Sequence, residues 1–235
     1  MTDEDADGGD TEDADGGDTE DADGAPEAPL DRYRAATATV VADALDEHGT
    51  GGVIGGIDPA HPDHVAVGRA IPVRMERVET DEHTNFPRAL FEAFEPGGAF
   101  VVSSPTDRLS CWGALASRLA DRAGMGGVVI DGGFRDVPEI REGAFGVFGA
   151  DTTPRSGQKR LRVAAVGEPV EVDGVEVAAG DAIVGDATGI AVVPAAEAPA
   201  VAGTVGEILD KEAALDRKVA DGYTAERLLA EYEGF

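Results

Sequence analysis

A charged pair stands directly after a predicted buried strand. Residues 128–130 are β-branched and bounded by glycines, which is typical of a strand in a core. The chain then passes through two further glycines and reaches Arg135 and Asp136. Open α/β sheets place their ligands beyond the C-terminal ends of such strands, so the pair stands where chemistry is often carried out.

The two side chains have complementary uses. A guanidinium matches the planar fork of a carboxylate, with charge-assisted hydrogen bonds of roughly 1.5 to 3 kcal/mol each. A carboxylate binds a hard divalent cation that keeps most of its waters. Together, Arg135 and Asp136 would bind a 2-oxo acid, with Arg135 on its carboxylate and a cation on its keto oxygen. Taken alone, the pair also fits a capping aspartate beside a surface arginine.

A predicted helix start upstream favours the chemical interpretation. The run SCWGALASRLA places Gly113 at the start of an amphipathic helix that ends at Gly124. Amides at a helix start carry unpaired donors and a partial positive charge, and they bind anions. A carboxylate held between the amides of residues 113–116 and Arg135 would be well satisfied.

The other candidate residues are weaker indications of a functional site. His61 and His64 have a spacing that some metal sites use, but Pro62 disfavours a helix there, so we expect a solvated loop. Cys111 has no histidine nearby in sequence to activate it and is expected to be a small buried thiol. The run GGVIGG at 51–56 does not match the dinucleotide fingerprint and is expected to be a turn.

The elements that must position these residues follow from the hydrophobic pattern. One helix is expected from Leu30 to Gly49, strands within 64–79, and a short helix before Pro96. A strand then precedes the helix of residues 113–124, and another strand follows the charged pair. Residues 162–194 contain short strands with close turns, an antiparallel region, and helices are expected at about 195–219 and 224–232. This order predicts a layered α/β sandwich and not a purely parallel doubly wound sheet.

The amino-acid composition limits the kinds of partner that the protein is expected to bind. The chain has 235 residues and a net charge of −28, with 47 acids, 19 bases and only three lysines. This surface is typical of adaptation to a salt-rich cytoplasm, where short Debye lengths screen self-repulsion. No basic patch favours nucleic-acid binding, and no apolar run or leader predicts a membrane span or signal peptide. A single cysteine fits a cytoplasmic location.

The chain opens with an acidic tandem repeat. Residues 2–24 carry 12 acids and no base, which leaves −16 for the remainder. The repeat has no apolar side chain larger than alanine after Met1, so we predict that residues 1–26 are a disordered tail and that 27–235 form one domain. A calcium loop is disfavoured because the closing glutamate and flanking helices are missing.

Several runs together resemble the RraA-like family, which contains class II 4-hydroxy-4-methyl-2-oxoglutarate aldolases and regulators of ribonuclease E activity. The likeness rests on WGALAS, GVVIDGGFRDVPEIRE and FGVFGADTTPR, with VVADALDEHG near the start and GDAIVGDATGIAVVP near the end. It covers nearly everything except the acidic tail. The resemblance implies a ββα sandwich of the swivelling-domain type with C-terminal helices, assembled as a homotrimer or hexamer with sites between subunits.

The resemblance also implies roles for individual residues. The amides of Gly113, Ala114, Leu115 and Ala116 would bind the pyruvoyl carboxylate together with Arg135. Asp136 would be the direct ligand of Mg²⁺ or Mn²⁺, and a neighbouring subunit would supply an acid, for which Glu207 and Glu212 are candidates. The aldolases tend to carry an acid directly after the helix-start glycine, where this chain has Ala114. Some members of the family are labelled menaquinone methyltransferases. This sequence has no strand followed by a glycine-rich cofactor loop that would support such an activity.

Two functions remain open at this point. One is a metal-dependent lyase that releases pyruvate from 4-hydroxy-2-oxo acids, with oxaloacetate decarboxylation through the same enolate. The alternative is a non-catalytic regulator that binds a ribonuclease or helicase partner. Retention of an aspartate beside Arg135 favours the lyase, because a protein that only binds has no need for a metal ligand there.

The first prediction concerns the acidic repeat. Deleting residues 1–26 should leave both activity and the melting temperature at high salt nearly unchanged, because the repeat has no apolar side chains to pack. Thermal unfolding of the full and shortened chains checks this. A drop of more than about 5 °C, on the order of 1 kcal/mol or more for a domain of this size, would show that the segment docks on the domain.

Overall fold

The structure, a computed structural model, describes residues 27–105 and 108–231. The acidic repeat expected to be disordered therefore lies outside the described residues. The described helices are α1 Glu27–Arg34, α2 Ala38–His48, α3 Arg88–Glu92, α4 Ala114–Arg122, α5 Val137–Arg141, α6 Ala198–Ala220 and α7 Ala225–Glu231. The described strands are β1 Gly52–Ile54, β2 Asp58–Pro59, β3 Ala66–Arg77, β4 Gly98–Ser103, β5 Ser110–Trp112, β6 Gly127–Phe134, β7 Val147–Thr152, β8 Leu161–Val166, β9 Val170–Val172, β10 Val175–Val177, β11 Ala182–Asp186 and β12 Gly189–Val193.

One mixed sheet organises the chain, in the order β1-β12-β11-β3-β4-β6-β7-β2, with β5 beside β6 and β8 beside β3. Strands β3, β4, β6 and β7 are mutually parallel, whereas β11, β12 and β1 join them antiparallel. The expected α/β class with an antiparallel region in the second half and C-terminal helices is thereby confirmed. The parallel centre brings the ends of β5, β6 and β7 to one edge.

The central strands are buried on both faces. On β4, Phe100 and Val102 point into a core shared with α3 and α4, whereas Ala99 and Val101 point into a second core. That second core is closed by residues of β9 to β12, among them Val172. Continuous apolar strands of this kind are expected where both faces of a sheet are covered.

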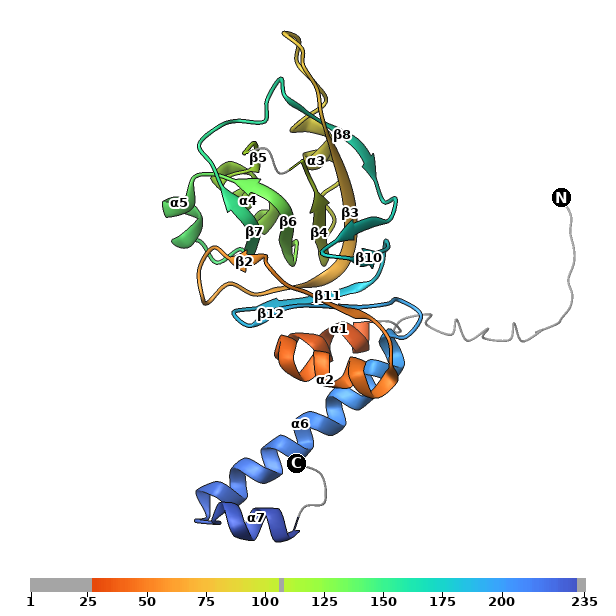
Figure 1. Cartoon of the computed structure of the whole chain (residues 1–235), viewed down its shortest axis with the longest axis vertical. Coiled ribbons are helices and arrows are strands. Elements are labelled where there is room, and N and C mark those ends of the chain that lie inside the picture. The colour runs from red at the N-terminus through yellow and green to blue at the C-terminus, as the bar shows by residue number, and fades with distance from the viewer. Residues whose placement is uncertain (1–26, 106–107, 232–235) are drawn as a thin grey trace, which may run out of the picture.

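A third core joins helices α1 and α2 to helix α6. Helices α1, α2 and α6 pack against β11 and β12 on the side away from α3 to α5 (Figure 1). The hydroxyl of Tyr33 donates a hydrogen bond to the carbonyl of Ala198 at 2.7 Å, which ties α1 to the start of α6. Burial raises the pKa of Tyr33 to about 12, so its hydroxyl keeps the proton that it donates.

Two local expectations were wrong. The single helix predicted from Leu30 to Gly49 is two helices, because Thr37 is extended and its hydroxyl accepts from the amide of Val40 as an N-cap. The C-terminal end at Gly49 is confirmed, with a left-handed φ of 62°. The run at 51–56, expected to be a turn, contains β1, which pairs with β12. Pairing between distant segments decided that outcome.

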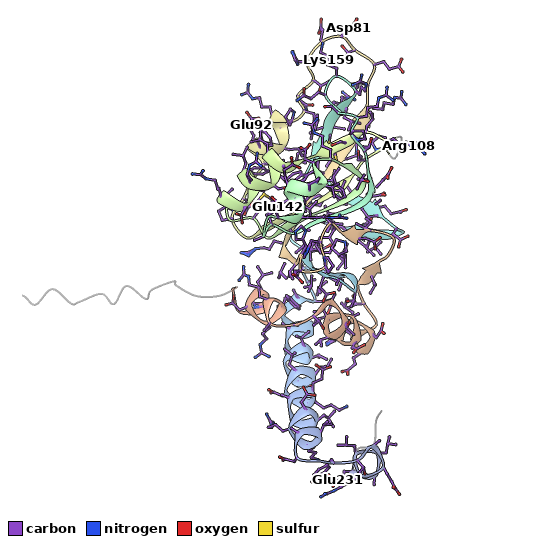
Figure 2. The ribbon with its side chains drawn as sticks, turned by 90° about the vertical axis from the view of Figure 1, so that its left-hand side faces the viewer. Asp81, Glu92, Arg108, Glu142, Lys159 and Glu231 are labelled. Atoms are coloured by element: carbon purple, nitrogen blue, oxygen red, sulfur yellow. The ribbon has the colours of Figure 1, made fainter. Side chains whose placement is uncertain are left out.

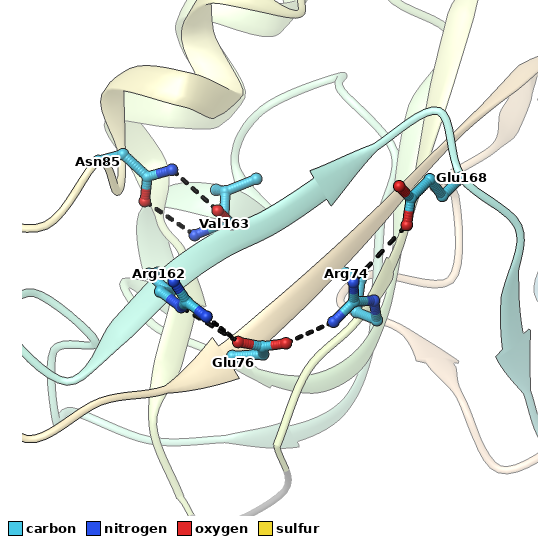
Figure 3. A network of polar contacts seen from close by, with 6 residues as sticks. All are labelled: Arg74, Glu76, Asn85, Arg162, Val163 and Glu168. Carbon is cyan, nitrogen blue, oxygen red and sulfur yellow. Dashed lines mark hydrogen bonds and ion pairs between the residues drawn. The ribbon is translucent and has the colours of Figure 1, made fainter.

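The loop before α3 is tied to β8 by side chains. The amide group of Asn85 donates to the carbonyl of Val163 at 2.8 Å and accepts from its N–H at 3.0 Å (Figure 3). The hydroxyl of Thr84 donates to the carbonyl of Leu161 at 2.7 Å. These hydrogen bonds fix the position of the following residues, from Phe86 onward, relative to the sheet.

A network of charged side chains lies across β3 and β8, next to these hydrogen bonds. Glu76 accepts hydrogen bonds from Arg74 of its own strand and from Arg162 of β8, and Arg74 also faces Glu168 (Figure 3). Hydrogen bonds from Arg162 and then Arg74 lower the pKa of Glu76. Since these groups are exposed, we regard them as aligning the two strands more than stabilising them.

The molecule is elongated. Asp81, in the loop after β3, and Glu231, at the end of α7, lie at opposite extremes, and α6 extends well beyond the sheet (Figure 2). No helix among residues 27–105 and 108–231 combines the length and apolar character that crossing a bilayer requires.

Substitution of the buried carboxylate of Asp181 tests what stabilises the second half of the chain. One oxygen of Asp181 accepts from the amide of Ala178 at 2.8 Å and the other from that of Ala195 at 2.9 Å. Asp181→Ala should lower the free energy of unfolding by about 2 to 4 kcal/mol, since it leaves two amides without acceptors. Asp181→Asn, which keeps one oxygen, should lose less. Denaturant unfolding at high salt measures both against the exposed Asp58→Ala, and equal midpoints would contradict the prediction.

Candidate functional site

The ends of three strands present the charged pair. Strand β6 delivers Arg135 immediately after Phe134, and the Arg135 amide donates to the carbonyl of Trp112 in β5 at 3.1 Å. On the other side, the amide of Thr153 donates to the carbonyl of Phe134 at 2.9 Å. Backbone hydrogen bonds from both neighbouring segments therefore fix the position of Arg135 and Asp136.

Asp136 adopts an unusual backbone conformation. Its φ of 60° and ψ of 40° are left-handed, a region that aspartate tolerates better than most residues. The side chain does not cap its own helix α5 and turns instead toward α4. There Oδ2 accepts from the amide of Ala114 at 3.2 Å and lies 3.6 Å from Nε of Arg135. A strained residue of this kind often marks a functional site.

Gly113 makes this approach possible. A Cβ atom added to Gly113 would lie 2.6 Å from Oδ2 of Asp136 and 3.2 Å from Cγ of Arg135. Its φ of −168° is extended, so the requirement for glycine is one of space and not of backbone strain. The helix-start glycine predicted from sequence therefore packs directly under both charged side chains.

The start of α4 is held by Trp112 and Ser117. The indole Nε1 of Trp112 donates to the hydroxyl of Ser117 at 2.9 Å, and this hydroxyl faces the carbonyl of Gly113 at 3.3 Å. The amides of Leu115 and Ala116 have no acceptor among the described residues. They remain available to an anion, whereas the amide of Ala114, also predicted to bind substrate, donates to Asp136.

Arg135 and Asp136 lie between two hollows. One, of about 110 Å³, is lined by Phe86, Pro87, Leu90, Phe91, Ser110, Cys111, Trp112, Gly113, Leu115, Ala116, Arg135, Asp136, Ser156 and Gln158. The other, of about 340 Å³, is lined by Arg135, Asp136, Val137, Pro138, Thr152, Thr153 and Pro154. The terminal nitrogens of Arg135 hydrogen-bond to no described residue, and its side chain is 40% exposed. The guanidinium is thus free to bind an anion.

Cys111 belongs to the lining but is inert. Its side chain is buried, as expected from sequence. Burial raises the pKa of the thiol to about 12, against a smaller opposing effect of Ser104. At neutral pH the group remains a thiol and supplies neither a nucleophile nor a base.

The residues present suit a weakly held cation. Oδ1 of Asp136 has no partner among the described residues, and the side chain is 39% exposed at the edge of both hollows. One free carboxylate oxygen fits Mg²⁺ or Mn²⁺ that keeps most of its waters. Within residues 27–105 and 108–231, no cluster of three or more acidic, histidine or cysteine side chains is placed to enclose a metal.

The acids proposed to come from a neighbouring subunit lie far from this pair in the chain itself. Glu207 and Glu212 are on α6, beside α2, in a surface hollow with Asp43, Glu47 and Lys211. Strands β11 and β12 stand between α6 and α4 (Figure 1). Neither acid reaches Arg135 of its own chain, so either could take part only in the site of another copy.

The His61–His64 pair is not a metal site. The expected solvated loop is wrong for His64, which is 2% exposed. Its Nδ1 accepts from the amide of Val147 at 3.3 Å, and Nε2 faces the carbonyl of Gly143 at 3.2 Å. Both ring nitrogens are therefore engaged with backbone, and His64 connects this loop to β7.

Sequence reasoning missed one wall of the smaller hollow. Phe86, Leu90 and Phe91 come from the segment that Asn85 ties to β8, while Ser156 and Gln158 follow β7. The run NFPRALFEAF indicates a short apolar helix, but nothing in its spacing relates it to Arg135. Only the pairing between Asn85 and Val163 brings it there.

Comparisons with known proteins identify the family of the chain. The family model described as RraA-like, Aldolase/RraA, matches residues 37–192. A protein of Halalkalibacterium halodurans, provisionally named 4-hydroxy-4-methyl-2-oxoglutarate aldolase, is 28% identical over 206 residues, covering 86% of this chain and 93% of its own.

Solved structures show the same fold. An uncharacterised protein from Pseudomonas syringae pv. tomato superposes with a TM-score of 0.76 at 27% identity, covering 86% of this chain and 96% of its own. Streptomyces coelicolor RraAS2, described as an unusual member of the RNase ES inhibitor RraA protein family, superposes with a TM-score of 0.72 at 24% identity, covering 80% and 96%. The family match spans most of the chain and includes Gly113, Arg135 and Asp136. The chain therefore belongs to the RraA-like family.

Proposed function

We propose that the chain is a divalent-metal-dependent lyase that cleaves 4-hydroxy-2-oxo acids of the 4-hydroxy-4-methyl-2-oxoglutarate type to pyruvate. The observation that carries the proposal is the convergence of three kinds of group on one small hollow. These are the terminal nitrogens of Arg135, the amides of Leu115 and Ala116, and one oxygen of Asp136, none of which has a partner among the described residues. The aldolase name of the Halalkalibacterium relative supports the same activity.

Each residue has a distinct role in this proposal. Arg135 and the amides of Leu115 and Ala116 bind the C1 carboxylate, through charge-assisted hydrogen bonds and the helix dipole. Asp136 would hold a Mg²⁺ or Mn²⁺ ion, which when bound would supply Lewis-acid polarisation of the ketone oxygen. The hydrogen bond from Ala114 orients the Asp136 carboxylate. Substrate is thereby fixed at both ends of its pyruvoyl group.

The reaction needs a proton acceptor for the 4-hydroxyl. Loss of this proton accompanies cleavage of the bond between C3 and C4, and the three-carbon fragment then takes up a proton at C3 to become pyruvate. Among the described lining residues, Asp136 is the only carboxylate and Cys111 keeps its proton. We assign the role to a carboxylate of a neighbouring copy in a trimer or hexamer, with Glu207 and Glu212 as candidates.

Decarboxylation of oxaloacetate is a second activity that the same residues would support. Loss of CO₂ leaves the same three-carbon enolate that cleavage of a 4-hydroxy-2-oxo acid leaves. Binding of the C1 carboxylate by Arg135 would be unchanged. No base for a 4-hydroxyl is needed in this reaction, so oxaloacetate separates pyruvoyl binding from proton transfer.

A regulator without catalytic activity is the second candidate. The likeness to the RraA-family structure from Streptomyces favours it, because that protein has the same fold and is described as belonging to an inhibitor family. Such a protein would bind a ribonuclease or helicase and would release no pyruvate. Pyruvate release on metal addition therefore distinguishes the two functions.

Substitution of the charged pair should separate metal binding from substrate binding. Asp136→Asn keeps the size but removes the charge, so kcat should fall by about 100-fold or more, with partial rescue at high Mn²⁺. Arg135→Lys keeps the charge but loses the planar fork, so KM should rise by about tenfold while metal dependence remains. Pyruvate release from 4-hydroxy-2-oxo acids and oxaloacetate measures both.

The wild-type protein provides the control for these two variants. A chelator should abolish activity, and added Mg²⁺ or Mn²⁺ should restore it. Pyruvate release that continues unchanged in chelator, or a fully active Asp136→Asn variant, would refute the mechanism.

The packing of Gly113 yields a test that removes no charged group. Gly113→Ala should reduce activity by about tenfold or more, because its Cβ displaces both Asp136 and Arg135. Gly203→Ala in α6, where a Cβ meets open space, is the matched control and should stay fully active. Equal activity of the two variants would show that the close packing has no catalytic consequence.

A further inference from the structure

One residue, Trp112, links the two parts of the site that would bind a carboxylate. Its backbone carbonyl accepts a hydrogen bond from the amide of Arg135 at 3.1 Å, at the end of β6. Its indole Nε1 donates to the hydroxyl of Ser117 at 2.9 Å, in the first turn of α4. The guanidinium and the helix-start amides therefore belong to segments that are joined through a single residue.

The first turn of α4 needs a link of this kind. Its N-cap is Gly113, which has no side chain to hold the exposed amides in place. The amide and the hydroxyl of Ser117 both donate to the carbonyl of Gly113, at 3.1 Å and 3.3 Å. Leu115 and Ala116 lie between these two residues in the chain. The hydrogen bonds of Ser117 therefore fix the turn that carries their amides.

The indole is itself held in one orientation. Trp112 is 2% exposed, and its ring stacks on that of Phe145 at 6.2 Å between centroids, with an interplanar angle of 18°. The ring of Phe100 meets it edge-on, at 6.1 Å and 79°. A buried indole N–H that lacks an acceptor costs free energy, and the enclosing rings keep this donor directed at Ser117.

We propose that Trp112 and Ser117 are positioning residues, which keep the helix-start amides at the separation from Arg135 that a bound carboxylate requires. Donors that share one carboxylate must be held to within about 0.5 Å of the productive geometry. The inference rests on the proposed binding of the C1 carboxylate of a 2-oxo acid at this site. All these contacts lie within one chain, so they do not depend on what a neighbouring copy adds to the site.

Ser117→Ala tests the link without reshaping the site, because Ser117 lines neither hollow. Pyruvate carries the C1 carboxylate and is not itself cleaved. Thermal unfolding of the full chain in saturating Mg²⁺ and high salt, with increasing pyruvate, gives its dissociation constant. Ser117→Ala should bind pyruvate about tenfold more weakly, whereas Ser117→Thr, which keeps a hydroxyl, should stay within about twofold of wild type. Unchanged affinity in Ser117→Ala would overturn the proposal.

Trp112→Phe removes the same hydrogen bond from its other partner. It should weaken pyruvate binding by about the same factor, and the double variant with Ser117→Ala should bind no more weakly than either single variant. Losses that multiply would show that the two side chains act separately, contrary to the proposal. Because each variant removes the bond alone, the test stands if one of them does not fold.

Phe145→Leu is the matched control for loosening of the core. Phe145 is buried against the indole but lines neither hollow and takes no part in the bond to Ser117. Its replacement should lower the midpoint of denaturant unfolding and leave pyruvate affinity within about twofold of wild type. If Phe145→Leu weakens pyruvate binding as much as Ser117→Ala does, affinity follows the stability of the core and the positioning role is refuted.

Metal binding and turnover separate this inference from the function beneath it. In Ser117→Ala the affinity for Mn²⁺, measured by electron paramagnetic resonance, should change less than about twofold, since Ala114 holds Asp136 independently. An equal loss of Mn²⁺ affinity would show that the whole site is disturbed and would overturn the proposal. With oxaloacetate, KM should rise by about tenfold while kcat falls less than about threefold.

The two proposals fail in different ways. Wild-type protein that turns over no 2-oxo acid, with pyruvate binding that still weakens in Ser117→Ala, refutes the lyase and supports the positioning role. Pyruvate release with an unchanged KM in Ser117→Ala supports the lyase and refutes the positioning role. Wild-type protein that binds no pyruvate refutes both.

Discussion

The site depends on one hydrogen bond between segments that are 22 residues apart, from the amide of Ala114 to the carboxylate of Asp136. It joins the start of α4 to the end of β6, and it is possible only because residue 113 has no side chain. The left-handed backbone of Asp136 turns its carboxylate away from α5 and toward α4. Oδ2 of Asp136 is used in this bond, whereas Oδ1 has no partner in the part of the chain that the structure describes. The same residue therefore both fixes the geometry and keeps an oxygen available to a ligand.

This arrangement divides the neighbouring groups by role. Arg135 pairs with Asp136 through Nε at 3.6 Å, and its terminal nitrogens have no hydrogen-bond partner among the described residues. Leu115 and Ala116 line the same hollow as Phe86 and Phe91. Charged and apolar groups thus border one hollow.

Local patterns in the sequence correctly predicted the strand that precedes Arg135 and the glycine-led helix start, because each depends on residues within one turn or strand. The β-branched run before Gly132 is a strand, and Gly113 does precede α4. What depends on distant segments was not predictable. The break at Thr37, the pairing of β1 with β12 and the burial of His64 against β7 all arise from tertiary contacts. The wall of the hollow belongs to this second group, since Asn85 places it by binding Val163.

That contact has a consequence for how the protein behaves among copies of itself. Strand β8 pairs with β3 along one side, and at Val163 its other side exposes a donor and an acceptor. Asn85 occupies both with a single side chain, acting as a one-residue surrogate for a strand. Open strand edges are templates for β-sheet aggregation, and natural proteins block them in several ways. Because these hydrogen bonds do not depend on net charge, Asn85 covers the strand edge at Val163 at low and at high ionic strength alike.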